Sequence, residues 1–158
     1  MNELQPLIIV TMTELTEKNI RDAFPKAVVQ SSEADGALIL KLNATMLLPV
    51  CELLRSNPEL GFDYLADITA IDWKDRIELV YRITALARNE KIVLRVDLDR
   101  ANPTIDSVSS VWKGAIFQER EVYDLMGVVF TGHPDLRRIL LPEDWEGYPL
   151  RKDYVIPD

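Results

Sequence analysis

Glu119 is the residue of this chain whose type and position come closest to acid–base chemistry. On a helix it would lie between Ala115 and Ile116 one turn earlier and Val122 and Tyr123 one turn later, which places a carboxylate on an apolar stripe. A buried carboxylate needs hydrogen-bond donors or a cation, or it takes up a proton. The position allows two interpretations: a proton-active acid, or a structural acid satisfied by backbone N–H groups or by an arginine.

Two arginines are candidate partners of Glu119, and a second acid lies on the same helix. Arg137 and Arg138 are the candidate cations for the Glu119 carboxylate, because the segment after the helix must fold back somewhere. Glu121 lies between Phe117 and Leu125 on the same helix, and we expect it to do similar work.

The other reactive side chains give little support for catalysis. His133 is the only histidine and could serve as a base, but no nucleophile or pocket is evident beside it, so we expect a loop-fixing hydrogen bond or an intersubunit contact. Cys51 falls on the apolar face of a predicted helix, which is typical of inert core packing. Ser107, Ser109 and Ser110 have no adjacent histidine.

Composition excludes several kinds of site. One cysteine and one histidine cannot supply the ligands of an iron–sulfur cluster or of the usual zinc sites. No glycine-rich nucleotide fingerprint and no P-loop occurs. The net charge of −8 argues against binding to nucleic acid or directly to anionic lipid.

Length and hydropathy indicate one domain. A chain of 158 residues with 47% hydrophobic content can build a real core. No apolar run is long enough to cross a bilayer, and the start lacks the basic region of a signal peptide. We therefore expect an unexported protein in a reducing compartment, which other subunits would have to hold at any membrane.

Local patterns predict alternating helices and strands. Thr11 and Glu14 have the spacing of a capping box, Gly127 is a natural helix stop, and strict alternation in two successive strands predicts an antiparallel hairpin. The predicted elements, in chain order, are a helix from Thr11 to about Phe24, strands over 27–30 and 37–42, a helix over 46–56, strands over 62–71, 77–87 and 92–98, and a helical stretch capped by Asp106 or Ser107 and split at Gly114. This order predicts an α+β fold, a two-layer sandwich with about five strands.

The segment after the last helix is predicted to be an extended tail. Pro134, Pro142 and Pro149 interrupt it, and no hydrophobic period survives between them. We therefore divide the chain into a core, 1–127, and a tail, 128–158. The tail is rich in the residue types that dominate interface hot spots, which favours contact with a partner over wrapping of its own domain; these residues are Arg137, Arg138, Trp145, Tyr148, Arg151 and Tyr154.

Several motifs resemble the C subunit of the proton-pumping NADH-quinone oxidoreductases, respiratory complex I. The resemblance is densest in the last forty or so residues and weaker but consistent upstream. It departs at Val155, where that family often has proline. The motifs that carry it are Phe62-Asp63-Tyr64-Leu65, Ile71-Asp72-Trp73, Glu119-Arg120-Glu121, Asp124-Leu125-Met126, His133, Arg137 with Ile139-Leu140, and the run Gly147 to Asp153.

This resemblance implies a mixed sheet and a hydrophilic subunit of the peripheral arm, on the cytoplasmic side of the membrane. The protein would bind no cofactor, with FMN and iron–sulfur clusters in partner subunits, and would pack against the D subunit and neighbouring hydrophilic subunits during electron transfer from NADH to quinone. The implied family signature is Glu119, Arg120, Glu121, Asp124, His133, Arg137, Ile139 and Leu140. The implied partner contacts are Arg138, Trp145, Tyr148, Arg151 and Lys152.

Two alternatives remain open at the level of sequence. The same module could serve a membrane-bound hydrogenase or a coenzyme-F420-type dehydrogenase, because the chain carries none of the chemistry in which those machines differ. A stand-alone acidic enzyme using Glu119 and His133 would require a pocket that joins the two residues.

Overall fold

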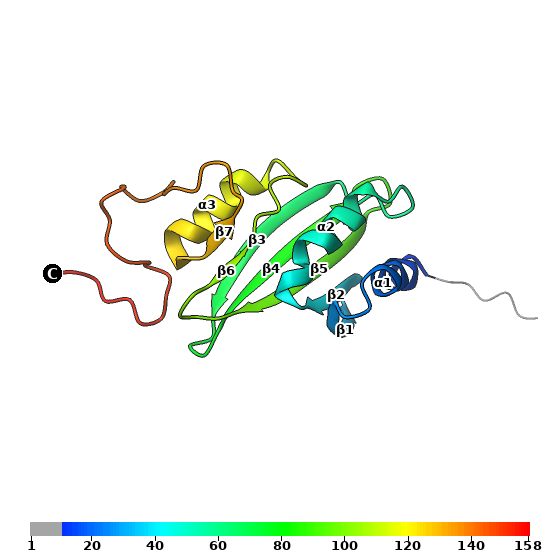
Figure 1. Ribbon diagram of the computed structural model, residues 1–158, viewed down its shortest axis with the longest axis horizontal. Helices are drawn as coiled ribbons and strands as arrows, with labels where there is room; N and C mark the ends of the chain where they lie inside the picture. Colours follow the sequence, from blue (N-terminus) through cyan, green and yellow to red (C-terminus); the bar gives the residue numbers. More distant parts are fainter. Residues whose placement is uncertain (1–10) are drawn as a thin grey trace, which may run out of the picture.

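A computed structural model describes residues 11–158, and the apolar run Ile8-Ile9-Val10 lies outside them. Figure 1 shows the elements in chain order. They are α1 (Met12–Ala23), β1 (Val28–Ala34), β2 (Ala37–Leu42), the 3-10 turn η1 (Ala44–Met46), α2 (Leu47–Ser56), β3 (Tyr64–Asp72), β4 (Ile77–Ala85), β5 (Glu90–Leu98), β6 (Thr104–Asp106), α3 (Ala115–Met126) and β7 (Val129–Thr131).

The main sheet has five strands in the order β1-β2-β5-β4-β3. The central β2–β5 pair is parallel, and the other three pairs are antiparallel. The predicted hairpin is the β4–β5 pair, which closes at Ala85 opposite Glu90. The α+β class, the order of the main elements and the mixed sheet are thus confirmed.

Alternation along the strands builds the core. The predicted apolar side of β4, from Ile77 to Ile83, is buried together with the alternating apolar residues of β5, from Ile92 to Leu98. Helix α2 adds Cys51 and Leu54 to the same cluster. Cys51 is fully buried, and burial raises the pKa of its thiol, so the prediction of an inert core residue is confirmed.

Helix α1 begins with the predicted capping box. The Glu14 amide donates to the Thr11 hydroxyl at 3.2 Å, and the Thr11 amide donates to the Glu14 carboxylate at 2.9 Å. Ile20 of this helix is fully buried in the core. α1 and α2 lie on one face of the sheet, while α3 packs beside β3 (Figure 1).

The predicted helical stretch from Asp106 or Ser107 to Gly114 is wrong, because residues 107–114 form turns and α3 begins at Ala115. Trp112 holds these turns against the core, where its indole N–H donates to the Phe62 carbonyl at 3.1 Å. The helix ends as predicted at Gly127, which adopts a left-handed φ of 75°.

The small parallel sheet of β6 and β7 was not predicted. It brings Val128 and Phe130, the first residues of the predicted tail, into the core. No helix or strand occurs in residues 132–158, as predicted for this segment. This segment loops out from α3 at one end of the molecule and returns toward the β3 end of the sheet (Figure 1).

Candidate functional site: the anchor of the tail on helix α3

The carboxylate of Glu119 is buried among neutral groups. Its Oε1 accepts hydrogen bonds from the Val108 amide at 2.8 Å and from the Ser107 hydroxyl at 3.2 Å, and Oε2 has no partner among the described residues. Burial raises the pKa of Glu119 to about 7, against the lowering effect of these two donors. Only one oxygen of the acid is therefore satisfied, by a backbone N–H and a hydroxyl.

The predicted arginine partners of Glu119 are wrong. Arg137 pairs with Asp135 at 2.9 Å on the surface, and Arg138 pairs with Asp124. Glu121 is exposed rather than buried. The reason is the orientation of α3, which turns Phe117 and Glu121 toward solvent. The side of the helix that was expected to be buried with Glu121 is therefore exposed.

Asp124 is the centre of the tail anchor. Its Oδ2 accepts hydrogen bonds from three successive backbone amides, those of Ile139, Leu140 and Leu141, at 3.1, 2.7 and 3.0 Å. Its Oδ1 lies 2.8 Å from Arg138 Nη1. Burial opposes the charged form, but Arg138 and the three amides outweigh it and hold the pKa of Asp124 below its ordinary value.

Two arginines bind the tail through its backbone. Arg138 Nη2 donates to the carbonyls of Trp145 and Gly147, each at 2.9 Å, so the loop curves around its guanidinium. Arg120 donates to the carbonyls of Arg137 and Arg138 at 3.1 and 2.9 Å. Because these bonds end on main-chain atoms, they fix the path of the segment rather than individual side chains.

Tyr148 closes the second half of the anchor. The guanidinium carbons of Arg138 and Arg151 lie 5.2 and 5.4 Å from the centroid of its ring, which is the range of cation–π contacts. Arg151 also donates to the Met126 carbonyl at 2.7 Å. A Cβ on Gly127 would lie 2.7 Å from the Tyr148 ring, so only glycine admits this close approach.

The end of the tail is fixed to the sheet. The Lys152 amide donates to Asp72 at the end of β3, at 2.9 Å, while the Lys152 side chain is exposed. Arg100 pairs with both oxygens of Asp72 at 2.9 Å and reaches Asp153 at 3.2 Å. Asp72 and Arg100 were not predicted as anchors; the signal available was the place of Asp72 in the Ile71-Asp72-Trp73 motif.

His133 fixes a loop. The Asp135 amide donates to its Nδ1 at 2.9 Å, which makes Nε2 the donor to the Ile116 carbonyl, also at 2.9 Å. Both ring nitrogens are thus engaged, and neither bond leads to Glu119. The expectation of a loop-fixing hydrogen bond is confirmed.

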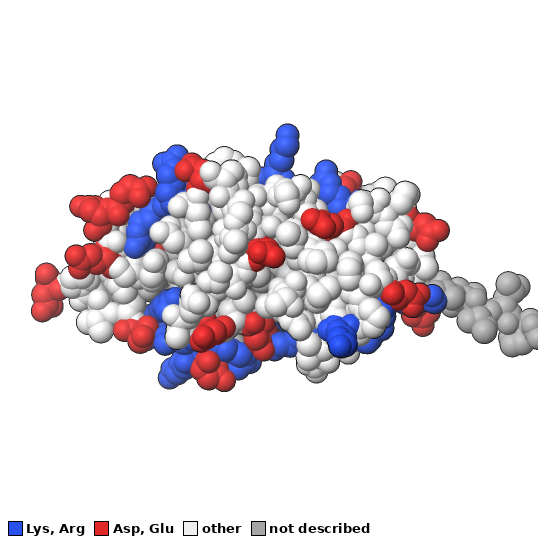
Figure 2. Space-filling model, viewed as in Figure 1, with Lys and Arg blue, Asp and Glu red and all other residues white. Residues whose placement is uncertain are grey.

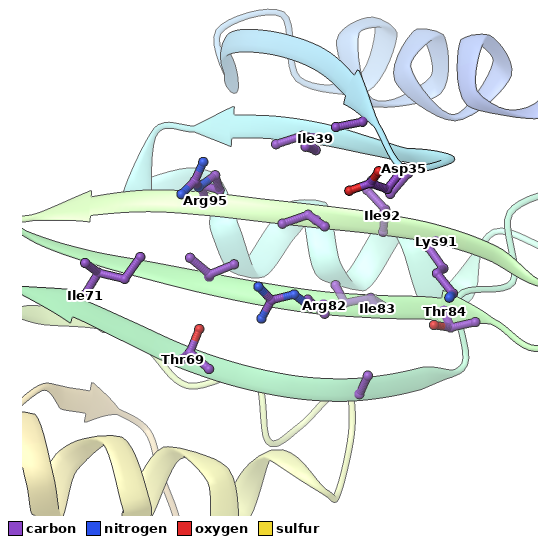
Figure 3. A pocket seen from close by; sticks show the side chains of 15 residues that line it. Asp35, Ile39, Thr69, Ile71, Arg82, Ile83, Thr84, Lys91, Ile92 and Arg95 are labelled. Atoms are coloured by element: carbon purple, nitrogen blue, oxygen red, sulfur yellow. The ribbon is translucent and has the colours of Figure 1, made fainter.

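None of the hollows described over residues 11–158 is lined by Glu119 or by His133. A hollow of about 490 Å³ lies on the open face of the sheet, where Figure 3 shows Ile39, Arg82, Lys91 and Arg95 around it, and its lining includes neither Glu119 nor His133. Within residues 11–158 no group of three or more His, Cys, Asp or Glu side chains is placed to hold a metal ion. In the same part of the chain, no helix has both the length and the apolarity to span a bilayer.

The anchor lies within a region that matches a known protein family. The family described as respiratory-chain NADH dehydrogenase, 30 Kd subunit, matches residues 40–158, which include α3 and the whole tail. The chain belongs to this family. As a 30 Kd subunit, it is part of an oxidoreductase complex together with other subunits.

Named relatives agree with the family. The C subunit of the NADH-quinone oxidoreductase of Roseiflexus sp. (strain RS-1) is 40% identical over 139 residues, 86% of this chain and 80% of the relative. The protein of the same name from Geobacter metallireducens is 38% identical over 141 residues, 87% of this chain and 86% of the relative. That of Moorella thermoacetica is 46% identical over 115 residues, 69% of this chain and 78% of the relative.

Solved structures share the fold. A trypsin-resistant fragment of Nqo5, residues 1–134, is 30% identical with a TM-score of 0.62, over 76% of this chain and 98% of the fragment. A chain of the membrane-bound sulfane sulfur reductase, an archaeal respiratory membrane complex, has a TM-score of 0.77 over 92% of this chain and 87% of its own. At 24% identity, the second likeness concerns the fold alone.

The structure brings half of the eight residues of the predicted signature of this 30 Kd subunit together. Arg120, Asp124, Ile139 and Leu140 meet in the anchor, where Arg137 contributes only its carbonyl. Glu119 and His133 make separate contacts, and Glu121 faces solvent. The five predicted partner contacts stay predictions. Their surroundings differ, because Arg138, Tyr148 and Arg151 are engaged by the chain's own residues while Trp145 and the Lys152 side chain are exposed; the five are Arg138, Trp145, Tyr148, Arg151 and Lys152.

Proposed function

We propose that this chain is a non-catalytic, cofactor-free scaffold in the peripheral arm of an NADH:quinone oxidoreductase. It supports assembly and the neighbouring D subunit, which helps form the quinone site, while FMN and the iron–sulfur clusters lie in partner subunits. The arm places it on the cytoplasmic side of the membrane, held there through the complex.

One observation carries this proposal. The segment 132–158 holds a fixed path without helix or strand, because Asp124 of α3 binds its amides and Arg138 and Arg151 of the segment bind Asp124 and the Met126 carbonyl. Its outer side chains remain exposed along that path, with Leu140 62% and Leu150 60% accessible. A fixed segment with an exposed apolar side is preorganised for a partner, since the entropy of ordering it is already lost before binding.

Truncation before Leu141 tests the proposal. We expect the shortened chain to fold, because the core lies before this point, but to be absent from the purified complex. A matched control deletes 155–158 only, which leaves every contact of Tyr148, Arg151 and Lys152 in place. Unchanged yield of the complex with the longer truncation would contradict the scaffold role.

The identity of the machine is tested on the same purified material. Co-purifying flavin, cluster absorbance and NADH-to-quinone activity support the NADH:quinone oxidoreductase. Cluster absorbance without flavin or NADH activity would support the alternative, a membrane-bound hydrogenase or a coenzyme-F420-type dehydrogenase.

A further inference from the structure

The loop from Ile139 to Leu150 has an outer face that its own domain does not use. Leu140 and Leu150 are mostly exposed, and Trp145 is 38% exposed. Isolated apolar side chains on a surface need no explanation, but three exposed ones within twelve residues of one fixed loop make that loop a candidate docking surface. We call this set, together with the acids of the same loop, the outer face.

The loop is held before any partner arrives. Its first amides bind Asp124, its middle carbonyls bind Arg138, and the Leu150 amide donates to the Leu125 carbonyl at 3.0 Å. Within the loop, the Trp145 amide donates to the Pro142 carbonyl at 3.0 Å. The outer face therefore presents its side chains from a fixed backbone.

The charge of the outer face is of one sign. Glu143, Asp144 and Glu146 are exposed, and none of them forms an ion pair within residues 11–158. The sequence from 139 to 150 contains no lysine or arginine. Figure 2 shows acidic side chains gathered at the end of the molecule where the tail lies.

The open face of the sheet offers a contrast. Two of its cations are paired within the chain, since Arg82 pairs with Asp67 at 2.9 Å and Arg95 with Glu78 at 3.0 Å. The hollow there is lined by Asp35 as well as by Lys91, so that face presents charges of both signs to a partner. The three loop carboxylates form no ion pair among the described residues, although Arg137, already paired with Asp135, lies close enough to Glu143 to feel its charge. A basic partner would therefore complement them.

We propose that the outer face of residues 139–150 docks into a basic groove, lined with apolar sockets, on a neighbouring protein of the complex. The inference rests on the proposed function and specifies the chemistry of the partner. Leu140, Trp145 and Leu150 fill the sockets, and the three carboxylates meet lysine or arginine at the rim. Nucleic acid and anionic membrane carry the wrong charge for this surface.

Charge reversal of the full-length tagged chain, in cells that assemble the complex, tests this. The variant Glu143→Lys/Asp144→Lys/Glu146→Lys is compared with Glu33→Lys/Glu52→Lys/Glu59→Lys, which changes the net charge equally at exposed acids elsewhere. We expect the first to lower the share of chain found in the complex about tenfold at low salt, because like charges then face each other, and the second to leave it unchanged. The neutral variant Glu143→Gln/Asp144→Asn/Glu146→Gln should fall between them, and it replaces the reversed chain if that fails to fold.

A further variant, Leu140→Ser/Leu150→Ser, separates the apolar from the charged contribution and should also lower incorporation. If Leu140→Ser/Leu150→Ser is missing from the complex while the charge-reversed chain assembles normally, the scaffold role stands and the basic groove is overturned. If both assemble normally while truncation before Leu141 does not, the tail acts through other residues and the docking inference is overturned. Equal loss in both charge variants would also overturn it, since net charge alone would then be responsible.

Discussion

Asp124 and Arg138 form a buried ion pair, 2.8 Å long, that joins the last helix to the tail. Each member also binds main-chain atoms: Asp124 accepts from three amides, and Arg138 donates to carbonyls further along the loop. The pair thus acts as one unit, because loss of either charge leaves the other buried without a counter-ion.

Replacement of this acid gives the first prediction. Asp124→Asn should lower the free energy of unfolding by about 3 kcal/mol, since Arg138 loses its buried counter-ion and the amides lose a charged acceptor. Chemical denaturation of the isolated chain measures it. Asp135→Asn, which breaks an exposed pair with Arg137, is the control and should leave the midpoint nearly unchanged. Equal effects of the two variants would show that burial of the pair contributes nothing.

The Glu119 carboxyl should make the free energy of unfolding depend on pH. In the folded state its pKa is about 7, above the ordinary value of 4.5. Between pH 4.5 and about 7, the folded state therefore keeps a proton that the unfolded state has released. Stability should therefore fall as pH rises through this window, by about 3 kcal/mol in total. Glu119→Gln imitates the protonated acid and should match the wild type near pH 4, below both pKa values, and exceed it near pH 8.

Denaturation curves of both proteins across this window measure the difference. Ser107→Ala removes a donor that favours the charged acid, so it should enlarge the fall and extend it to higher pH. A difference between Glu119→Gln and wild type that does not vary with pH would mean that folding does not raise the pKa of Glu119.

Gly127 gives a prediction about close packing. Gly127→Ala should cost more than the roughly 1 kcal/mol expected of a left-handed backbone position, because its Cβ would overlap the Tyr148 ring. Gly36→Ala is the matched control, since Gly36 has the same φ of 75° with nothing within 4 Å. We expect trypsin to cut the tail faster only in Gly127→Ala. Tail cleavage at the same rate in both would mean that backbone strain, not the ring, decides the effect.

The far end of the tail can be released separately. Asp72→Asn should loosen the segment around Lys152, because Arg100 and the Lys152 amide lose their shared carboxylate. Hydrogen exchange should show faster exchange of the Lys152 amide while the amides at 139–141 stay protected by Asp124. Loss of protection at both places would mean that the two ends of the tail form one cooperative unit.

Local signals predicted local structure well. The capping box at Thr11, the stop at Gly127 and the alternation in β4 and β5 concern neighbours in sequence, and each is found as expected. The parallel β2–β5 pair could not be read in this way, because its partners lie about fifty residues apart and share no local pattern. Strands β6 and β7, three residues each, are too short to show a period.

The site was predicted by residue type but not by pairing. The sequence places Arg137 beside Arg138 with nothing to tell which of them turns inward, and the structure gives the buried position to Arg138. A backbone N–H was one of the two kinds of partner expected for Glu119 and is found, but the residues that supply the donors were not predicted. Ser107 and Val108 reach it only because residues 107–114 are not helical, and their turns bring the start of the segment over α3.

The main-chain character of the anchor has a consequence for the divergence of this protein among species. Because Arg120 and Arg138 bind carbonyls of the tail and Asp124 binds its amides, the path of the tail depends little on the side chains of the residues that are bound in this way. Outward side chains such as Leu140 and Glu143 are then free to co-evolve with whatever faces them. Homologous tails are thus expected to superimpose in backbone while their outer surfaces change in step with the neighbouring protein.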